Sequence, residues 1–308
     1  MNYYNINREI KTAALKLGFS FCGITLAEPL ENKREYYSEF IRGKGHGIFR
    51  YLETNLEKRL DPKLILDDAR SVIAVLLNYY PPEVLPEEDN YIIAKYAYGK
   101  DYHAVMKKKM NDLIDFLNAE YPGFKAKAFV DSGPVMEKTW AQQAGVGWQG
   151  KNTLLINKNS GSFFFIGIIF TNLELDPDQP GKDHCGECRR CIEACPTGAL
   201  SQPYQLDISR CISYHTIENK NDIPEELKDK FRDRIYGCDI CQDVCPYNRF
   251  SKPAIDPTRT PHPDFLQMRK KDWLSLTEEQ FNTLFKGTPV YRTGYRRLIE
   301  NIRFATTG

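Results

Sequence analysis

Residues 183–200 read DHCGECRRCIEACPTGAL, and this stretch decides how the rest of the chain is interpreted. Its four cysteines follow one another at the spacing C-x2-C-x2-C-x3-C, and a proline comes directly after the last of them. In bacterial ferredoxins with this spacing, the first three cysteines bind one 4Fe–4S cluster and the fourth binds a second cluster. The stretch therefore predicts a two-cluster module whose remaining ligands lie elsewhere in the chain.

The remaining ligands are expected downstream. The segment GCDICQDVCPYN, residues 237–248, contributes three cysteines, and Cys211 stands between the two runs. Eight cysteines thus fall between residues 185 and 245, the number that two clusters with four thiolates each require. The crossing of each Cys-Pro cysteine to the other cluster predicts Cys185, Cys188, Cys191 and Cys245 for the first cluster and Cys195, Cys211, Cys238 and Cys241 for the second. Because Cys211 replaces a cysteine close to the second run, the module is a variant of the ferredoxin pattern.

Two other uses of clustered cysteines fit less well. Structural zinc favours paired C-x2-C knuckles, which explain neither the C-x2-C-x2-C triplet nor the two Cys-Pro dipeptides. A disulfide framework conflicts with the cytoplasmic location that the rest of the sequence predicts. Cys22 is the one of the 9 cysteines outside this window, and we expect it on a short buried strand as a small core residue.

The composition is that of an ordinary globular protein: of 308 residues, 27% are charged and 42% hydrophobic, and the formal net charge is +1. The first residues, MNYYNINREIKTAALKLGF, lack the apolar core and the cleavage site of a secretion signal. The longest apolar run, FFFIGIIF at 163–170, is too short to cross a bilayer. We therefore expect a cytoplasmic protein with no membrane partner, in which clustered cysteines bind metal more often than they pair.

Roughly 180 residues precede the cysteine module, and they alternate between helical and strand patterns. Helices are expected over 5–18, 31–43, 47–58, 101–121 and 134–145, strands over 21–25, 71–80 and 126–131, and a β-hairpin with an Asn-Ser-Gly turn over 152–172. The continuous apolar run at 71–80 is typical of a strand covered on both faces. The predicted fold class is α+β, with an α/β-like core and a two-cluster ferredoxin-like module. The expected domains are 1–178, a catalytic domain; 179–250, the cluster module; and 251–308, a basic helical segment.

No nucleotide-binding motif accompanies this pattern, because neither G-x-G-x-x-G nor G-x-x-x-x-G-K-[ST] occurs. The segment DYHAVM, 101–106, begins like the D-x-H-x-x-G signature of proteins that bind cobalamin through a histidine, but Met106 occupies the glycine position. A single histidine in a helix is more often a surface or core residue than a ligand. We therefore do not expect His103 to bind cobalt.

Seven parts of the sequence, in order and with matching spacing, resemble epoxyqueuosine reductases. They are GFSFCGIT (18–25), EKRLDPKLILDDARSVIAV (57–75), YAYGKDYHAVMKKKM (96–110), FVDSGPVMEKTWAQQAGVGWQGKNTLLI (129–156), TNLELDPD (171–178), CGECRRCIEACPTGAL (185–200), and RCISYHTIE (210–218) with GCDICQDVCPYN (237–248). The resemblance implies a cobalamin-dependent enzyme with two 4Fe–4S clusters and a core similar to that of reductive dehalogenases. It further implies that the enzyme reduces epoxyqueuosine to queuosine at the wobble position of tRNA. Many relatives continue into a HEAT-like helical repeat, whereas this chain stops at Gly308 and so resembles the short form.

The reaction that the resemblance implies can be compared with the residues present. Removal of the epoxide oxygen requires two electrons and protonation of the departing oxygen, and cob(I)alamin re-reduced by low-potential clusters can supply the electrons. The resemblance implies that Asp131, in the motif VDSG, is the proton donor and lies at the cofactor. The alternative is that Asp131 caps the helix expected near Pro134.

The resemblance also implies a set of cobalamin contacts in the domain 1–178. They are Arg59, Tyr98, Asp131 and the loop residues Trp148, Gln149, Gly150, Lys151 and Asn152, with Ser209 and Ser213 as further contacts beside Cys211. Other roles are open for some of them. Tyr98 and Trp148 are equally typical of core aromatics, and Arg59 has an ion pair with Asp61 as its alternative.

Transfer RNA is the expected macromolecular partner, although a net charge of +1 gives no overall attraction for a polyanion. The positive charge is local: Lys107–Lys109, Arg269–Lys271, and a tail in which Lys286, Arg292, Arg296, Arg297 and Arg303 are interleaved with Tyr291 and Tyr295. Basic residues mixed with aromatic ones suit a loop with splayed bases, and a solvated helix face is the alternative. We also expect a monomer that takes electrons from an external donor such as a flavodoxin or a ferredoxin.

Two other functions fit parts of the sequence. A corrinoid reductive dehalogenase would share the core and the clusters, but such enzymes typically carry a twin-arginine export signal, which this sequence does not show. A ferredoxin-type electron-transfer subunit would bind no corrinoid and would leave the roughly 180 upstream residues unexplained.

Overall fold

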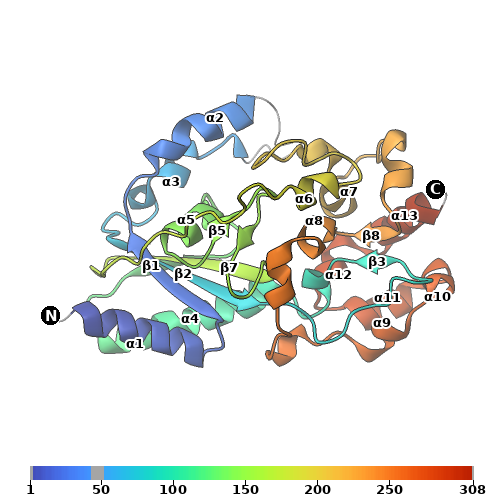
Figure 1. The fold of residues 1–308 in the computed structure, drawn as a ribbon. Coiled ribbons are helices and arrows are strands. Elements are labelled where there is room, and N and C mark those ends of the chain that lie inside the picture. Colours follow the sequence, from blue (N-terminus) through green and yellow to red (C-terminus); the bar gives the residue numbers. More distant parts are fainter. Residues whose placement is uncertain (1–2, 43–51, 307–308) are drawn as a thin grey trace.

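The computed structural model describes residues 3–42 and 52–306 and is built around a four-stranded antiparallel sheet (Figure 1). Its strands, in spatial order, are β1 (Phe21–Leu26), β2 (Ser71–Asn78), β7 (Phe164–Thr171) and β4 (Ala126–Phe129). Ile168 of β7 lies between Ala74 of β2 and Phe129 of β4. The two longest strands therefore form the centre of the sheet.

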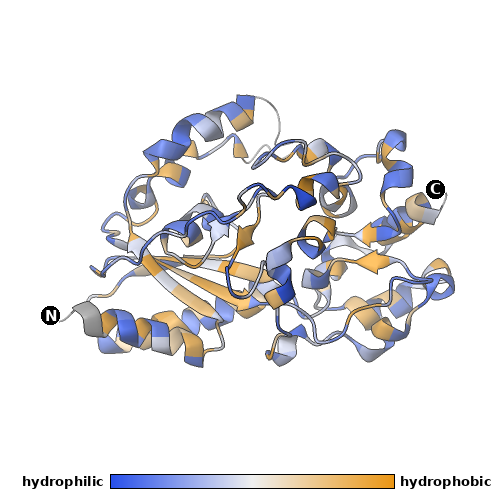
Figure 2. Ribbon diagram, in the orientation of Figure 1, coloured by the Kyte–Doolittle hydropathy of each residue, from blue (hydrophilic) through white to orange (hydrophobic). Residues whose placement is uncertain are grey.

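Helices cover both faces of this sheet. On one face lie α1 (Tyr3–Lys16) and α4 (Tyr102–Glu120), and on the other lies α5 (Glu137–Gln143) (Figure 1). Successive side chains of β2 point to opposite faces: Ile73, Val75 and Leu77 pack in the core with α1 and α4, and Val72, Ala74 and Leu76 pack in the core with α5. The expectation of a strand covered on both faces is therefore confirmed, and Figure 2 shows these strands as predominantly hydrophobic.

The β-hairpin expected over 152–172 is wrong. β6 (Leu155–Ile156) pairs with β5 (Trp148–Gln149) in a separate two-stranded sheet, whereas β7 joins the central sheet. A bridge between Asn157 and Gly161 is what remains of the expected turn. The physical reason lies in the run 163–170, which is apolar on both faces. Such a strand is stable with a neighbour on each side and helices above and below, and a solvated hairpin would not provide them.

The expected helices occur with shifted ends. The helix 101–121 is α4, and Asp101 is its N-cap, accepting a hydrogen bond from the backbone N–H of His103 at 3.0 Å. The helix 134–145 is α5, which begins later, at Glu137. The helix 31–43 is α2 (Arg34–Arg42), and of the helix 47–58 the structure describes only residues 52–58, where α3 (Leu56–Leu60) begins. No helix within the described ranges is long and apolar enough to cross a membrane.

A second lobe holds the cysteine module and the C-terminal helices. Its elements are β3 (Ile92–Ile93), α6 (Arg190–Glu193), α7 (Ile212–Ile217), β8 (Arg234–Tyr236), α8 (Ile240–Asp243), α9 (Pro263–Gln267), α10 (Lys270–Leu274), α11 (Glu278–Phe285), α12 (Pro289–Thr293) and α13 (Tyr295–Thr306). β3 pairs with β8 in parallel, and the core around Trp273 takes side chains from 85–98, 235–236 and 265–302. All three expected domains thus contribute to one core, so 251–308 packs as part of a larger lobe.

Candidate functional site

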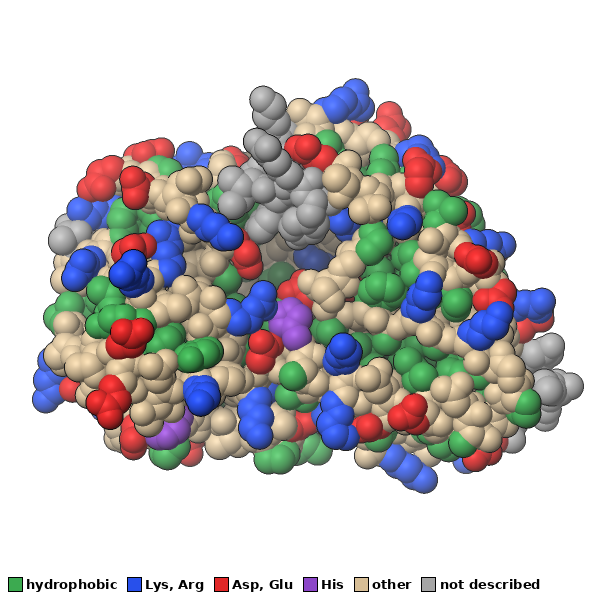
Figure 3. Space-filling view, turned by 180° about the vertical axis from the view of Figure 1, so that it is seen from behind, with side chains coloured by type: hydrophobic (Ala, Val, Ile, Leu, Met, Phe, Trp, Pro, Cys, Tyr) green, Lys and Arg blue, Asp and Glu red, His purple; other side chains and the backbone are tan. Residues whose placement is uncertain are grey.

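A cavity of about 1290 Å³ is lined by residues of both lobes. The sheet side contributes Tyr102, His103 and Asp131, and the second lobe contributes Cys211 and Arg292. The face seen in Figure 3 is hollowed near its centre, and acidic, basic and histidine side chains gather around the hollow. Because ionisable side chains and thiols meet in one concave site, this cavity is the candidate active site.

Asp131 lies in the loop that follows β4. Its backbone φ is 48°, in the left-handed region, and its side chain is 69% exposed. One carboxylate oxygen, Oδ2, accepts a hydrogen bond from the hydroxyl of Tyr102, and Nε2 of His103 lies 3.8 Å from the same atom. The alternative role as a helix cap is wrong, because α5 begins at Glu137 with Met136 at its N-cap position. Asp131 is therefore free to serve the cavity.

Tyr102 and His103 are positioned by the first turn of α4. The Tyr102 ring stacks on Phe165 of β7 with ring centroids 4.3 Å apart, and His103 stacks on Tyr102 at 4.1 Å. Nδ1 of His103 lies 2.8 Å from Oδ1 of Asp101. Burial and, to a smaller extent, the charge of Asp131 raise the pKa of Tyr102, so its hydroxyl stays protonated and continues to donate. Tyr102 was not among the residues expected from the sequence, where the only available signal was its place directly after the N-cap.

A second carboxyl group lines the same cavity and was also not expected from the sequence. Burial raises the pKa of Glu137 to about 7, with a smaller contribution from the charge of Asp131. Its neighbour Lys138 also lines the cavity, and its Nζ donates to the carbonyl oxygen of Thr153 at 2.8 Å. Burial lowers the pKa of Lys138. The only signal in the sequence was an acid in the first turn of the expected helix.

Of the expected cobalamin contacts, four line this cavity. They are Arg59, Asp131, Asn152 and Ser213. Arg59 is buried with its guanidinium 5.9 Å from the centre of the Tyr37 ring, and Asn152 donates to the carbonyl oxygen of Cys241 at 3.2 Å. Arg59 is only 6% exposed, so it does not lie on the surface as the alternative of an ion pair with Asp61 supposes.

The other expected contacts lie elsewhere. Tyr98 belongs to the core around Trp273: its hydroxyl accepts a hydrogen bond from the backbone N–H of Leu85, and its ring packs on Phe265. The hydroxyl of Ser209 donates to Asp207 at 2.6 Å. Neither side chain lines the 1290 Å³ cavity, so the core role that was the alternative for Tyr98 describes it better.

Residues 148–151, which include β5, do not line the large cavity, and Trp148 and Lys151 contact the segment 185–188 instead. The buried indole N–H of Trp148 donates to Sγ of Cys185 at 3.5 Å. Nζ of Lys151 donates to the carbonyl oxygens of Gly186 and of Cys188, the latter at 3.1 Å. Gln149 and Gly150 continue the same loop, and a Cβ at Gly150 would lie 2.3 Å from the Ile156 side chain. The sequence could not show which of these residues line the large cavity and which contact the cysteine segment, because residues 148–152 lie beside both.

The structure separates the eight cysteines into two sets of four. A small cavity of about 190 Å³ is lined by Cys185, Cys188, Cys191 and Cys245. The large cavity is lined by Cys195, Cys211, Cys238 and Cys241. These are the two sets that the crossing of the Cys-Pro cysteines predicts. We call them the first and the second thiol set.

The crossing follows from two short helices. α6 and α8 each carry one cysteine, and each is followed by a Cys-Pro dipeptide, Cys195-Pro196 and Cys245-Pro246. Proline cannot continue a helix, so the chain turns away after each of these cysteines and delivers it to the opposite thiol set. The two Cys-Pro dipeptides are therefore consistent with the sets to which Cys195 and Cys245 belong.

The thiols are suited to bind iron rather than to exist as free thiolates. Burial raises the pKa of Cys238 to about 12 and that of Cys241 well above its ordinary value. Iron would replace these protons and compensate the buried charge. In the described part of the chain, no three His, Cys, Asp or Glu side chains converge closely enough to hold a single metal ion. A four-iron cluster needs a wider arrangement, because each thiolate binds a different iron.

Comparison with protein families agrees with this grouping. Residues 184–248 match the model of the 4Fe-4S double cluster binding domain, and residues 59–132 match the model of epoxyqueuosine reductase QueG, DUF1730. With an acid and one thiol set in a common cavity, the fold and the site define the class of protein as an iron–sulfur oxidoreductase.

Two curated relatives identify the family within this class of oxidoreductases. The epoxyqueuosine reductase of Cellulophaga algicola is 48% identical over 295 residues, covering 96% of this chain and 96% of the relative. That of Pseudomonas aeruginosa is 37% identical over 302 residues, covering 96% of this chain and 83% of the relative. The chain belongs to the epoxyqueuosine reductase family.

Solved structures show the same relationship. An epoxyqueuosine reductase in complex with an epoxyqueuosine-modified tRNA-Tyr stem loop has a TM-score of 0.90 at 31% identity, covering 99% of this chain and 81% of that one. The enzyme from Bacillus subtilis, solved with its catalytic aspartate loop swung out of the active site, has a TM-score of 0.88 at 31% identity, covering 99% and 82%. A reductive dehalogenase shares the fold at 16% identity and a TM-score of 0.51, covering 97% of this chain and 35% of that one.

Proposed function

We propose that the chain reduces the epoxide of epoxyqueuosine in tRNA to the alkene of queuosine. One observation carries the proposal: Asp131, held by Tyr102, lines the same cavity as the second thiol set. A proton donor and a source of electrons are thus available to one substrate. Membership of the epoxyqueuosine reductase family supports this choice of substrate.

The reaction consumes two electrons and two protons and releases the epoxide oxygen as water. Both carbon–oxygen bonds break, and the two carbons become doubly bonded. The leaving oxygen is a poor leaving group unless it is protonated, so a positioned acid lowers the barrier. Asp131 is the proposed acid: its Oδ2 faces the cavity beside the Tyr102 hydroxyl and Nε2 of His103. The Tyr102 hydroxyl keeps the carboxyl group oriented, which is a positioning role.

Cobalamin is the proposed resident cofactor of the large cavity. The volume of about 1290 Å³ exceeds the range usual for small ligands, about 300–1,000 Å³. Arg59, Asn152 and Ser213 offer polar groups in the lining, as a corrin with amide side chains requires. Bound there, cobalamin would supply a low-valent cobalt centre as nucleophile or reductant, and the iron–sulfur clusters would return electrons to it one at a time.

His103 is not proposed as a cobalt ligand. Its Nδ1 lies against Asp101 at 2.8 Å, and its Nε2 is directed toward Asp131 at 3.8 Å. Nη1 of Arg292 approaches the same Nδ1 at 3.3 Å. These neighbours support a role for His103 in orienting the acid loop.

The proposed tRNA surface surrounds Arg292 and Arg296. Arg292 lines the cavity, and Arg296 is exposed on the first turn of α13. The tRNA stem loop bound by the relative supports a substrate of this kind. Other expected basic residues are engaged within the protein: Lys109 lies 3.0 Å from Asp256, Lys270 lies 2.9 Å from Asp233, and Arg297 donates to the carbonyl oxygen of His215 at 2.9 Å.

The test is turnover of epoxyqueuosine-containing tRNA by Asp131→Asn. Asparagine keeps the size of the side chain but supplies no acidic proton, so turnover should fall about 10²–10⁴-fold. Asp112→Asn is the matched control, because Asp112 pairs with Lys108 on the surface of α4. All three proteins are compared at equal iron and cobalamin content, with nucleoside mass spectrometry as the readout. Wild-type turnover in Asp131→Asn would remove Asp131 as the acid.

A further inference from the structure

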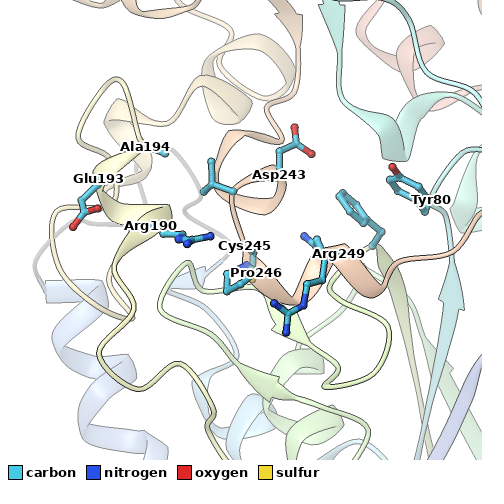
Figure 4. Close-up of a pocket in the computed structure, with 11 residues that line it drawn as sticks. Tyr80, Arg190, Glu193, Ala194, Asp243, Cys245, Pro246 and Arg249 are labelled. Atoms are coloured by element: carbon cyan, nitrogen blue, oxygen red, sulfur yellow. The ribbon is translucent and has the colours of Figure 1, made fainter.

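A separate cavity of about 790 Å³ lies next to the first thiol set. Cys245 and Pro246 line both this cavity and the small cavity of the first thiol set, and so do Arg190 and Arg249. Figure 4 shows the two arginines on either side of the Cys245-Pro246 turn. The wall is completed by the aromatic side chains of Tyr80 and Phe163. We call this region the outer cavity.

Two arginines and two acids are the charged residues that line the outer cavity. Arg190 and Arg249 are both exposed, and among the described residues neither forms an ion pair. Two acids also belong to the lining, but Asp243 lies 2.7 Å from Nζ of Lys95, and Figure 4 shows the carboxylate of Glu193 pointing away from the arginines. Glu193, like the two arginines, forms no ion pair among the described residues, but it is directed elsewhere, so the two arginines supply the charge that faces the cavity.

Aromatic side chains accompany the arginines. The guanidinium of Arg249 lies 4.6 Å from the ring centre of Phe250, which is 40% exposed. Arginine and exposed aromatic residues are the types enriched at protein–protein interfaces. An exposed aromatic side chain thus lies beside the outer cavity, although Phe250 is not part of its lining.

The two thiol sets occupy different positions relative to the substrate site. The second set lines the 1290 Å³ cavity with Asp131, whereas the first set lines a cavity shared with the outer one. Among the described residues, the outer cavity and the 1290 Å³ cavity have no lining residue in common. An electron delivered at the outer cavity would reach the first cluster, then the second, and then the substrate site.

We propose that the outer cavity is the docking surface for the electron donor, a small acidic protein that carries one low-potential electron. The proposal rests on the proposed function, which requires two such electrons for each turnover. In the docked complex the reduced carrier loses one electron and the first cluster gains it, with no bond formed or broken. Complementary charge would steer the carrier to this surface, whose lining includes neither Arg292 nor Arg296 of the proposed tRNA surface.

The test measures reduction of the clusters rather than turnover. Arg190→Glu with Arg249→Glu is compared with Lys16→Glu and Lys63→Glu, a double variant with the same charge change at two exposed lysines that line none of the three cavities. Each protein is mixed anaerobically in a stopped-flow instrument with an acidic flavodoxin in its hydroquinone state, or with reduced methyl viologen, a small cation. Iron content is measured first.

The arginine double variant should be reduced by flavodoxin at least about tenfold more slowly at low salt, with a weaker dependence on ionic strength. Its reduction by methyl viologen should be as fast as in the wild type or faster, and the lysine variant should match the wild type with both reductants. If both reductants react more slowly by the same factor, the arginines affect the first cluster itself and not the docking of the donor, and the proposal is overturned. A wild-type rate with flavodoxin would also overturn it.

Two further measurements keep the result decisive. If charge reversal lowers the iron content, the double variant Arg190→Gln with Arg249→Gln is used, because it neutralises the two charges without reversing them. The rate with flavodoxin should then fall by a smaller factor, and the rate with methyl viologen should not change. Turnover of modified tRNA with methyl viologen as the only reductant tests the proposed function separately. Failure of that turnover in the wild type counts against the function, whereas the flavodoxin rates alone decide the docking surface.

Discussion

The hydroxyl of Tyr102 donates a hydrogen bond to the carboxylate of Asp131, and the two residues are 29 positions apart in the chain. Tyr102 is held by its stacking on Phe165, so the bond connects an exposed loop to the rigid central sheet. Solvent surrounds much of the Asp131 side chain, which is 69% exposed, so this bond is a main support of the carboxyl group. In the Bacillus subtilis relative the catalytic aspartate loop has been found swung out of the active site.

Tyr102→Phe should therefore reduce turnover by weakening the hold on Asp131. The ring and its stacking remain, and only the hydrogen bond to a charged group disappears, which corresponds to roughly 10–100-fold in rate. We expect the effect in kcat, with little change in KM for tRNA. Tyr121→Phe is the control, because it removes a tyrosine–carboxylate hydrogen bond of 2.6 Å to Glu9 at the other end of α4. Equal kcat in both variants would deny Tyr102 a positioning role.

Glu137→Gln should change how stability depends on pH. Burial raises the pKa of Glu137 to about 7, whereas in the unfolded chain the value is about 4.3. Between these values the folded protein keeps a proton that the unfolded chain has released, so wild-type stability falls as the pH rises through this window. Glutamine does not titrate, so the stability of the variant lacks this decrease. From acidic to alkaline pH, the free energy of unfolding of the variant should rise relative to that of the wild type by at most about 3–4 kcal/mol. Denaturant unfolding of both proteins in the same metal state measures the difference, and parallel pH curves would contradict it.

Trp148→Phe should lower the reduction potential of the first cluster. A hydrogen bond to a cysteine sulfur favours the more negative, reduced state, and the Trp148 indole donates one to Cys185 at 3.5 Å. A bond worth about 0.5–1.5 kcal/mol corresponds to a shift of roughly 20–65 mV for one electron. Trp140→Phe is the control, because Trp140 is buried against Phe170 in the core. EPR-monitored redox titration gives both potentials, and unchanged values in Trp148→Phe would show that the bond has no electronic effect.

Cys211→Ala should remove the second cluster and leave the first largely formed. Cys211 belongs to the second thiol set and lines the 1290 Å³ cavity but not the 190 Å³ cavity. It lies outside the two cysteine-rich segments 185–195 and 238–245. Reconstituted protein should fall from about eight irons to about four. Iron analysis with EPR of the reduced protein measures this, and retention of both clusters would remove Cys211 from the ligands.

Arg296→Glu and Arg297→Glu, expected from sequence to act together, should behave differently. Arg296 is exposed, and its reversal should weaken tRNA binding and reduce the salt dependence of log Kd by about 0.7–0.9 for each phosphate that is no longer neutralised. Arg297 is only 18% exposed and bridges His215 and Glu300, so its reversal should chiefly lower the thermal stability. Filter binding over a salt series and thermal unfolding separate the two effects. A fall in Tm with Arg296→Glu but not with Arg297→Glu would contradict this division.

What could be predicted from the sequence was local. The apolar run of β2, the helix after Asp101 and the membership of each thiol set follow from spacing within short segments. Proline at 196 and 246 bears on two of the eight thiols, Cys195 and Cys245, because it prevents each short helix from continuing.

What could not be predicted depends on distant neighbours. β7 was expected beside β6, but its two apolar faces are satisfied between β2 and β4, which lie far away in sequence. Trp148 and Tyr98 have side chains suited to a cofactor or to a core, and only packing decides between them. The hydrogen bond from Tyr102 to Asp131 joins two separate elements, and no local pattern contains it.

Asn301 has a consequence for how the protein is made. Its buried side-chain amide donates to the carbonyl oxygens of Thr216 in α7 and Ile235 in β8, 85 and 66 residues earlier in the chain. These two segments flank Cys211 and Cys238. During translation both segments leave the ribosome well before the residue that ties them together. The second cluster site therefore becomes rigid only after residue 301 has been made, and we expect iron to be inserted there after α13 has emerged.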